Sequence, residues 1–150
     1  MTVQLEDLGP HNWEEVADLA VADDQRGLIA TNLYSIAESQ FLPDFHTKAI
    51  VFGKDVVGFA MYGEDPDDGH AWLYRLMIDH RFQRRGFGRA ALRLVICDVQ
   101  QELRADVLRL GVVPENAVAK ALYESAGFRP TGQSISGEEV LELRIETGCI

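Results

Sequence analysis

The chain has 150 residues, 47% of them hydrophobic and 25% charged, and a formal net charge of −10. This length suits one domain with a sizeable core, so residues 1–150 are predicted to form a single domain. The acidic balance argues against nucleic acid as a partner, because proteins that bind it carry basic patches. No apolar run approaches the roughly twenty residues that a membrane helix needs, which argues against a membrane partner.

Cysteine and histidine usage points to a protein without metal. Cys97 and Cys149 are the only cysteines of the sequence, so we expect no disulfide framework, and we expect Cys97 to have a packing role. The four histidines show no metal-ligand spacing, which predicts no metal site. The N-terminal residues lack the basic and apolar regions of a signal peptide. A cytoplasmic location is therefore expected.

Charge is distributed unevenly along the chain. Residues 1–70 hold fourteen Asp and Glu residues against three basic ones, whereas residues 71–150 hold ten acidic and eleven basic residues. Six of the fourteen basic residues lie between Arg75 and Arg93. An acidic half would attract a cationic ligand and a basic loop would hold an anionic one. The alternative is that the acidic residues only keep the surface soluble.

The first third of the chain is predicted to hold one strand and two helices. A short strand is expected over Val3–Asp7, and then a helix from Trp13 to about Ala22 with Asn12 as its N-cap. A second helix follows the break at residues 23–24, and Pro43 ends it. Its apolar residues recur at helical spacing, and they are Leu28, Ile29, Leu33, Ile36, Ala37 and Phe41.

The middle of the chain is predicted to be mostly strand. Lys48–Phe52 and Val56–Tyr62 form a hairpin, because a turn with glycine separates two runs of strand-forming residues. The segment from Gly63 to Gly69 is a turn-rich acidic loop. It leads into the apolar strand Trp72–Ile78, which is rich in residues that suit a half-buried sheet.

A glycine-bearing loop follows that strand. After the polar turn at residues 79–82 come Gln83, Arg84, Arg85, Gly86, Phe87 and Gly88, and a helix is expected from Arg89 to about Leu103. The first N–H groups of a helix have no internal partners, so such a loop forms an anion site. Glycines allow the main chain to approach a bulky anion closely, and the neighbouring arginines add positive charge. A ligand that carries phosphate is predicted here.

One alternative is a dinucleotide. Residues 86–91 fit the looser form of the dinucleotide fingerprint, which would imply NAD or FAD. Seven residues separate the strand end from Gly86, however, whereas the fingerprint follows its strand almost directly. The acidic residue expected about twenty positions further on, at the tip of a second strand, is also missing.

The last third of the chain alternates strand and helix. Val107–Val113 is expected to be a strand, and Gly111 within it indicates close approach of another backbone or a ligand. A helix runs from Asn116 through Ala126 and is closed by Gly127. Residues 128–135 and 139–145 form a final hairpin. The predicted order is β-α-α-β-β-β-α-β-α-β-β.

Two motifs carry a resemblance to a known family. Gln83-x-x-Gly86-x-Gly88, between a strand and a helix, resembles the acyl-CoA pyrophosphate loop of the GNAT superfamily of N-acetyltransferases. The run from Asn116 to Phe128 resembles its second signature, N-x-x-A-x-x-L-Y-x-x-x-G-F, roughly thirty residues downstream. The segments at 58–63, 74–79, 131–132 and 137–140 are similar to those of bacterial spermine/spermidine (diamine) acetyltransferases.

The resemblance implies a fold and a reaction. The fold would be the α/β (α+β) GNAT fold, a mixed central sheet with a β-bulge and a splay between its fourth and fifth strands. The pantetheine arm of acetyl-CoA would lie in the splay. The protein would transfer an acetyl group from acetyl-CoA to a primary amine of a polyamine such as spermidine or spermine, directly in a ternary complex. Relatives commonly form homodimers.

The resemblance also assigns residues to the acetyl donor. Backbone N–H groups near Met77 and Ile78 would hold the pantetheine arm, Asn116 would hydrogen-bond it, and Tyr123 would act as general acid toward the sulfur. Gln83 stands where arginine is common, which removes one guanidinium from the pyrophosphate. The implied cofactor-binding residues are Leu76, Met77, Ile78, Gln83, Arg84, Arg85, Gly86, Phe87, Gly88, Arg89, Ala90, Asn116, Lys120 and Tyr123.

The acceptor side is less specific. The implied substrate-binding residues are Tyr34, Glu38, Glu64 and Tyr74, with Glu38, or else water or Glu64, taking the proton of the amine. The alternatives are a GNAT enzyme that acetylates an aminoglycoside, an amino acid or a protein amino group, and a regulator that binds acyl-CoA without catalysis.

Overall fold

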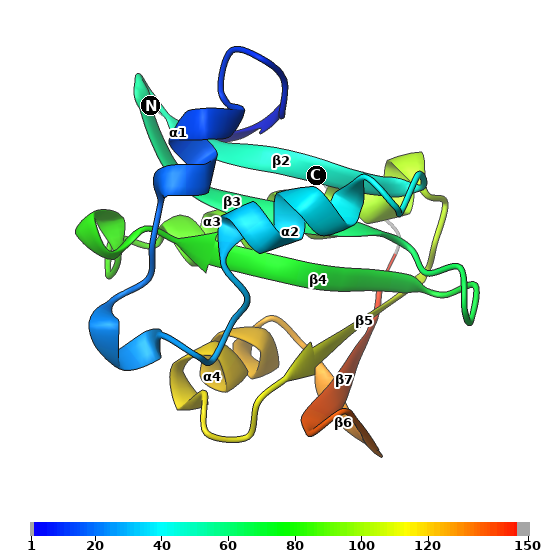
Figure 1. The fold of residues 1–150 in the computed structure, drawn as a ribbon. Helices are drawn as coiled ribbons and strands as arrows, with labels where there is room; N and C mark the ends of the chain where they lie inside the picture. Colours follow the sequence, from blue (N-terminus) through cyan, green and yellow to red (C-terminus); the bar gives the residue numbers. More distant parts are fainter. Residues whose placement is uncertain (1, 147–150) are drawn as a thin grey trace.

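The computed structural model describes residues 2–146, which form one seven-stranded sheet with helices on both faces (Figure 1). The sheet order is β1-β2-β3-β4-β5-β7-β6, and all neighbours are antiparallel except β4 and β5. This is the mixed sheet that the family resemblance implies. The strands are β1 (Val3–Asp7), β2 (Phe45–Phe52), β3 (Asp55–Glu64), β4 (Ala71–Ile78), β5 (Val107–Val112), β6 (Arg129–Ile135) and β7 (Glu138–Arg144).

The helices connect these strands in the predicted order. They are α1 (Trp13–Asp18), α2 (Asn32–Ser39), α3 (Phe87–Glu102) and α4 (Ala117–Ser125), and short 3₁₀ segments lie at Asp23–Gln25 and His80–Phe82. None of the helices within residues 2–146 is both long enough and apolar enough to cross a membrane.

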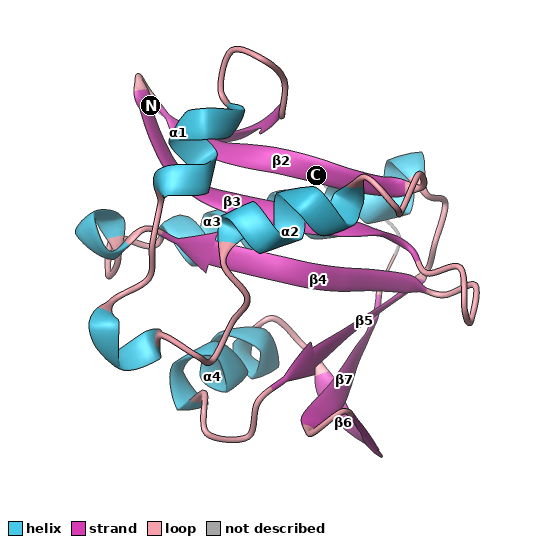
Figure 2. Ribbon diagram, viewed as in Figure 1, coloured by secondary structure: helices cyan, strands magenta, loops and turns pink. Residues whose placement is uncertain are grey.

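Alternation along the central strands builds a core on each face of the sheet, beneath the helices that Figure 2 shows on both faces. In β2, Ala49 and Val51 pack on the side of α1 and α2, whereas Ile50 packs on the side of α3. In β3, Phe59 packs on the side of α1 and α2, and Ala60 packs on the side of α3. Successive strand residues point to opposite faces, so both faces of these two strands need apolar residues. This explains their nearly continuous hydrophobic sequence.

The fourth and fifth strands separate after a short parallel ladder. Their register pairs run only from Ala71↔Leu108 to Leu73↔Leu110, and beyond them the two strands diverge (Figure 1). The register of β4 against β3 shifts at the same place, so that Tyr74 is the extra residue of a β-bulge. Bulges bend a strand and increase its twist, which accounts for the divergence. The predicted splay is confirmed, and the bulge lies on the β3 side of β4.

Helix α1 is shorter than the sequence predicts. It ends at Asp18 rather than near Ala22, because Ala20 forms tertiary hydrogen bonds instead of helical ones. Its N–H donates to Asp79 Oδ1 at 2.9 Å, and its carbonyl accepts from the N–H of His80 at 2.9 Å. Asn12 occupies the predicted N-cap position without capping: its side chain accepts from Gly9 and donates to the carbonyl of Asp7.

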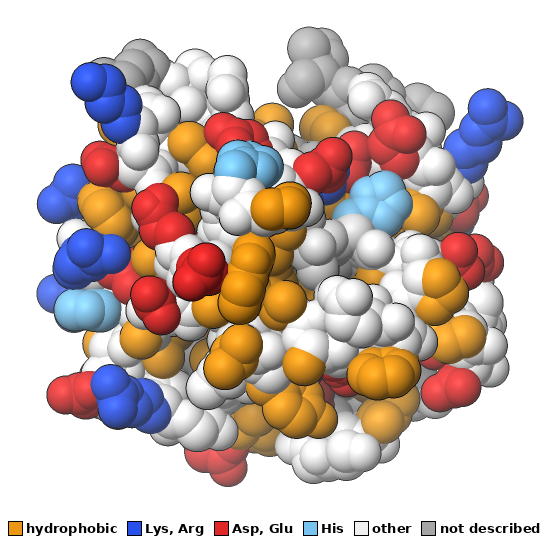
Figure 3. Space-filling view, turned by 45° about the horizontal axis from the view of Figure 1, so that its top comes forward, with side chains coloured by type: hydrophobic (Ala, Val, Ile, Leu, Met, Phe, Trp, Pro, Cys, Tyr) orange, Lys and Arg blue, Asp and Glu red, His pale blue; other side chains and the backbone are white. Residues whose placement is uncertain are grey.

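Helix α2 begins at Asn32, later than its apolar pattern suggests. Thr31 sets the start, because its Oγ1 accepts from the N–H of Tyr34 at 3.2 Å. Leu33 and Phe41 are 58% and 83% exposed, so the pattern does not mark a fully buried face. Figure 3 shows hydrophobic side chains gathered in the middle of the face that it presents.

Two further local features depart from expectation. Helix α3 begins at Phe87, two residues before Arg89, because Gly86 takes a left-handed conformation (φ 82°) and serves as its N-cap. Cys97, on α3, is disulfide-bonded, so the expectation of no disulfide is wrong for this residue. The other cysteine, Cys149, lies outside the described residues.

Close approach of β3 and β4 makes Gly58 sensitive to substitution. A Cβ there would lie 2.3 Å from the carbonyl oxygen of Met77, a backbone atom that cannot move away cheaply. Overpacking of this kind typically costs about 1–3 kcal/mol. We expect Gly58→Ala to lower the free energy of unfolding by that amount in urea titrations. Gly88→Ala is the control, because its Cβ would meet neighbours at an ordinary 3.7 Å. Equal stability of the two variants would contradict the packing described for β3 and β4.

Candidate functional site

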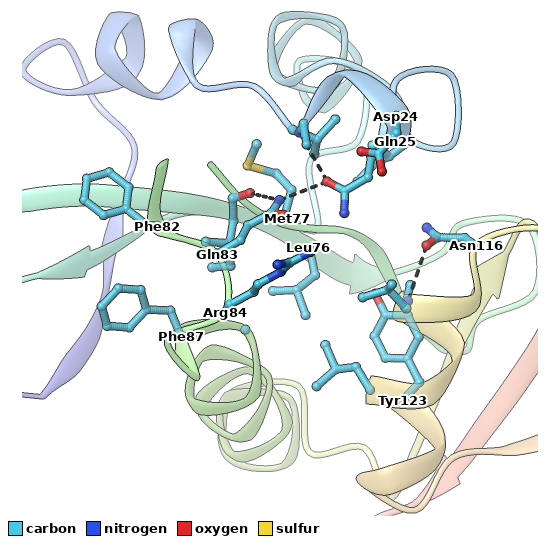
Figure 4. Close-up of a pocket in the computed structure, with 18 of the residues that line it drawn as sticks. Asp24, Gln25, Leu76, Met77, Phe82, Gln83, Arg84, Phe87, Asn116 and Tyr123 are labelled. Carbon is cyan, nitrogen blue, oxygen red and sulfur yellow. Dashed lines mark hydrogen bonds between the residues drawn. The ribbon is translucent and has the colours of Figure 1, made fainter. Parts of the chain in front are cut away.

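A cavity of about 390 Å³ lies between the end of β4, the loop before α3 and the first turns of α4 (Figure 4). The segment from Val21 to Ile29 forms its remaining wall. Most of the cofactor-binding residues predicted from the sequence line it, which brings together three segments far apart in the chain. These residues are Leu76, Met77, Ile78, Gln83, Arg84, Gly86, Phe87, Gly88, Asn116 and Tyr123.

One end of this cavity is suited to an anion. The first helical hydrogen bond of α3 runs from Ala90 to the carbonyl of Gly86, so the N–H groups of residues 87–89 have no partner within the helix. Arg84 is exposed, and its side chain extends from the loop into the cavity (Figure 4). Unpaired N–H groups, the positive end of the helix dipole and a guanidinium together favour a phosphate group.

Gln83 fixes the loop to its surroundings. Its Nε2 donates to the carbonyl of Ile78 and to Oε1 of Gln25, both at 2.9 Å (Figure 4). The amide therefore joins the end of β4 to the 3₁₀ segment that follows α1. Gln83 thus lines the cavity with a side chain already engaged in structural hydrogen bonds.

Four predicted cofactor-binding residues do not line the cavity, namely Arg85, Arg89, Ala90 and Lys120. The guanidinium of Arg85 lies over the ring of Phe82, 5.7 Å from its centroid. Lys120 lies 2.7 Å from Oε2 of Glu139, so it is paired with β7.

Helix α4 contributes a polar cap and a buried phenol. Asn116 Oδ1 accepts from the N–H of Ala119 at 3.3 Å, so it caps α4 while it lines the cavity. Tyr123 is 8% exposed, and its ring lies edge-on to that of Phe128. Burial raises the pKa of Tyr123 well above its usual value. Its hydroxyl is therefore protonated throughout the neutral range, as the ordinary pKa of a phenol already implies.

A second cavity, of about 140 Å³, fills the splay between β4 and β5. It shares Leu76, Asn116 and Tyr123 with the first cavity. On its other side it shares Tyr74 and Glu138 with a third hollow of about 440 Å³. The three spaces therefore adjoin one another in sequence, from the N-terminus of α3 to the hollow that α2 and β7 border.

The third hollow, which we call the acidic groove, is lined by five carboxylates and one basic residue, Arg75. The carboxylates come from α2, the loop after β3, and β7. Folding therefore brings together acidic residues that lie far apart in the sequence. They are Glu38, Asp65, Asp67, Asp68 and Glu138. A groove with this excess of negative charge attracts cations.

Two carboxylates of the acidic groove are held by aromatic side chains of β4. Asp65 accepts hydrogen bonds from the hydroxyl of Tyr74 and from the N–H of Asp67. Asp68 accepts from Nε1 of Trp72 at 2.9 Å. Burial, together with the hydrogen bond to Asp65, raises the pKa of Tyr74 well above its usual value. The predicted substrate-binding residue Tyr74 is therefore a neutral donor in the groove.

The other predicted acceptor residues have different positions. Glu38 lines the groove but is paired, with its Oε1 3.0 Å from Nη2 of Arg75, whose Nε also donates to Ser35. Tyr34 is 61% exposed and does not line the groove. Glu64 lines a separate hollow near the start of β5, and the next residue, Asp65, lies in the groove instead.

Asp79 is an important residue that the sequence interpretation treated only as part of a turn. It is 2% exposed and accepts from the N–H of Ala20 and from Nε of Arg81, at 2.9 and 2.7 Å. Burial alone would raise its pKa, but the hydrogen bonds from Ala20 and Arg81 outweigh burial, and the pKa is lowered. The sequence feature that could have indicated this role is an aspartate placed directly after a strand and two residues before an arginine. Asp79 links the anion-binding loop to the wall after α1.

Within residues 2–146, no three or more His, Cys, Asp or Glu side chains are grouped so that they could hold a metal ion.

Comparison with known proteins identifies several similar to this chain. A family model described as the Acetyltransferase (GNAT) family matches residues 13–128. The spermine/spermidine N(1)-acetyltransferase of Bacillus subtilis (strain 168) is 27% identical over 148 residues, which covers 94% of this chain and 97% of that protein. A ribosomal-protein alanine N-acetyltransferase of Escherichia coli (strain K12) is 43% identical over 58 residues, 39% of this chain and 38% of that protein.

Solved structures show the same fold. The spermidine N-acetyltransferase from Vibrio cholerae, solved in complex with CoA and spermine, superimposes with a TM-score of 0.74 at 16% identity. The match covers 94% of this chain and 93% of that one. At this identity the likeness concerns the fold alone.

The lowered pKa of Asp79 predicts a pH-dependent contribution to stability. A carboxyl group whose pKa is lowered by folding stabilises the protein above its ordinary pKa, and the contribution is lost as pH falls through the folded-state value. We expect Asp79→Asn to cost about 1.5–3 kcal/mol at pH 7, as for hydrogen bonds to a charged group. The difference from the unsubstituted protein should shrink below about pH 4. Urea titrations at several pH values measure it.

The control for this experiment is Asp23→Asn, because the side chain of Asp23 is 93% exposed. We expect this variant to match the unsubstituted protein at each pH. A cost for Asp79→Asn that stays constant down to pH 3 would contradict the linkage.

Proposed function

The chain belongs to the GNAT family of acetyltransferases, and from that premise we propose that it acetylates a primary amine of a polyamine such as spermidine or spermine. It is an N-acetyltransferase, and acetyl-CoA is its acetyl donor. The observation that carries the proposal is the meeting of an anion-binding cavity and the acidic groove at the splay between β4 and β5. Transfer would be direct, in a ternary complex.

The residues of the first two cavities fit acetyl-CoA. The N-terminus of α3 and Arg84 would hold its diphosphate, and Gly86 leaves the approach open, because a Cβ there would meet no atom within 4 Å. The edge of β4 beyond Leu73 has no strand partner on the β5 side, so its backbone groups are available to the amide-bearing arm. When bound, acetyl-CoA supplies the activated acetyl group as a thioester.

The acidic groove suits an acceptor with several positive charges. Asp65 and Asp68 are fixed as acceptors by hydrogen bonds, and Asp67 lies between them in the sequence. Polyamines present ammonium groups separated by short apolar chains, and Trp72, Leu73 and Ile135 supply apolar lining between the carboxylates. The Bacillus subtilis relative named for spermine and spermidine, which aligns over nearly the whole chain, supports this assignment.

Tyr123 would donate a proton to the departing sulfur. Its phenol is protonated at neutral pH, as an ordinary tyrosine is, and burial raises its pKa further. It lines both the first cavity and the splay, where the thioester of a bound donor would lie. A general acid in this position favours expulsion of the thiol.

A second candidate is acetylation of a protein amino group. The observation that favours it is the 43% identity to the Escherichia coli ribosomal-protein alanine N-acetyltransferase, which extends over only 58 residues. The alignment to the polyamine relative extends over 148 residues, so we rank the polyamine first. A cytoplasmic location and a homodimer remain predictions from the sequence.

Tyr123→Phe tests the role of the phenol. We expect turnover to fall by about 10²-fold or more, as for loss of a general acid, while the affinity for CoA measured by calorimetry is unchanged. Tyr62→Phe is the control, because Tyr62 is also buried but donates to Asp98, away from the cavities. Unchanged turnover would contradict the role of Tyr123, and absence of turnover in both forms would indicate a regulator that binds acyl-CoA.

An amine panel tests the acceptor. Thiol release from acetyl-CoA is followed with spermine, spermidine, putrescine and a peptide with a free N-terminus. We expect spermine and spermidine to react with the highest kcat/KM, and we expect added salt to lower it because it screens the acidic groove. A reactive peptide beside inert polyamines would overturn the assignment in favour of the second candidate.

A further inference from the structure

We propose that Glu138 is the catalytic base of this acetyltransferase: its carboxylate binds the reacting ammonium group and takes its proton. The proposal rests on the acceptor groove assigned above, and it concerns a residue to which the sequence interpretation gave no role. Three observations lead to it, namely the position of Glu138, the space that Gly111 leaves for it and the engagement of the neighbouring carboxylates.

Glu138 lies where the proposed acceptor groove meets the cavity in the splay. It lies at the start of β7 and lines both the acidic groove and the cavity in the splay. Among the carboxylates that line the groove in the described part of the chain, only Glu138 also lines the splay cavity. Tyr123 lines that same cavity from α4. An amine bound at Glu138 would therefore meet the donor at the point where Tyr123 faces it.

Gly111 makes room for this carboxylate. The ideal Cβ position of Gly111 on β5 lies 2.5 Å from Oε1 of Glu138 and 3.4 Å from its Cδ. Any side chain at residue 111 would thus occupy the place of the Glu138 carboxyl group. The glycine that the sequence marked as a site of close approach serves to admit Glu138 at the opening of the splay.

Three of the four other carboxylates of the acidic groove have partners, and the fourth, Asp67, lines the groove but not the splay cavity. Glu38 is paired with Arg75, Asp65 accepts from Tyr74, and Asp68 accepts from Trp72. Within residues 2–146, the side chain of Glu138 has no ion pair or hydrogen bond. A carboxylate without a partner is available to bind an ammonium group, and its exposure to solvent lets it pass a proton on.

The proton transfer balances without a further reactant. An N–H bond of the ammonium breaks, an O–H bond forms on Glu138, and the electron pair stays on nitrogen, which becomes the nucleophile. An alkylammonium has a pKa of about 10.4, so nearly all of the amine is protonated at neutral pH and must lose a proton before its nitrogen attacks. After transfer Glu138 releases the proton to solvent. The other titratable groups that line the same two cavities are Glu38, Asp65, Asp67, Asp68, Tyr74, Arg75 and Tyr123.

Glu138→Gln is the first test. The amide keeps the size of the side chain but is a far weaker base, so we expect kcat to fall by about 10²-fold or more. The limb of the pH–rate profile that reports a required carboxylate should disappear. Calorimetry without acetyl-CoA supplies a readout independent of turnover, and there we expect spermidine to bind about tenfold more weakly. Unchanged kcat together with unchanged spermidine affinity would overturn the proposal.

Gly111→Ala is the second test, because it displaces the carboxylate without removing it. The neighbour it would meet is the end of a flexible side chain, so the protein should fold with a similar thermal midpoint. We expect the loss of kcat to approach that of Glu138→Gln. Full activity in a folded Gly111→Ala variant would show that the placement of Glu138 is unimportant, and would count against the proposal.

Two matched control variants test whether the effect is specific to Glu138. Glu139→Gln changes the adjacent carboxylate, which is paired with Lys120, and should leave kcat and spermidine affinity unchanged. Asp67→Asn removes a carboxylate that lines only the groove, so it should raise KM for spermidine more than it lowers kcat. Equal losses in Glu139→Gln and Glu138→Gln would indicate a general charge effect and overturn the proposal.

If the amine panel finds another acceptor, these variants are assayed with that amine. Failure of the polyamine assignment is then distinguishable from failure of the role proposed for Glu138.

Discussion

The short parallel ladder between β4 and β5 is the constraint on which the site depends. Three register pairs, from Ala71↔Leu108 to Leu73↔Leu110, hold the strands together at one end. Beyond them each strand keeps its outer partner, β3 or β7, and loses its inner one. The sheet therefore stays intact at its edges while it opens at its centre. The opening lies between the N-terminus of α3 and the acidic groove, so the proposed donor and acceptor would meet at it.

Charge separation along this opening explains the composition of the chain. Arg84 and the N-terminus of α3 favour a diphosphate, whereas the groove beyond the splay carries five carboxylates. The strongly acidic first half supplies Glu38 and the loop after β3 to this groove. Arg75 moderates it, because its guanidinium binds Glu38 and Ser35 and thereby ties α2 to β4. The net charge of the protein is therefore partly a property of its site.

The sequence predicted the order of elements, because strand alternation and helix spacing are properties of short segments. The splay and the residues gathered around the first cavity were implied by the family resemblance that two local motifs carry. Prediction from the sequence failed where tertiary contacts compete with local ones. Asp79 ends α1 early because it accepts a hydrogen bond from the N–H of Ala20. A periodic hydrophobic pattern does not reveal such a role for a single aspartate. The structure brings the predicted acceptor residues together least completely. Asp65 and Glu138 lie in the groove through loop geometry and strand pairing, whereas Tyr34 and Glu64 do not.

A crystal structure of the protein with bound CoA tests the central claim most directly. The account predicts the diphosphate within hydrogen-bond distance of the N–H groups of Phe87 and Gly88. It also predicts the pantetheine arm between β4 and β5, with its sulfur next to Tyr123. CoA bound along another surface, or a splay closed by pairing of β4 with β5 beyond Leu73, would contradict it.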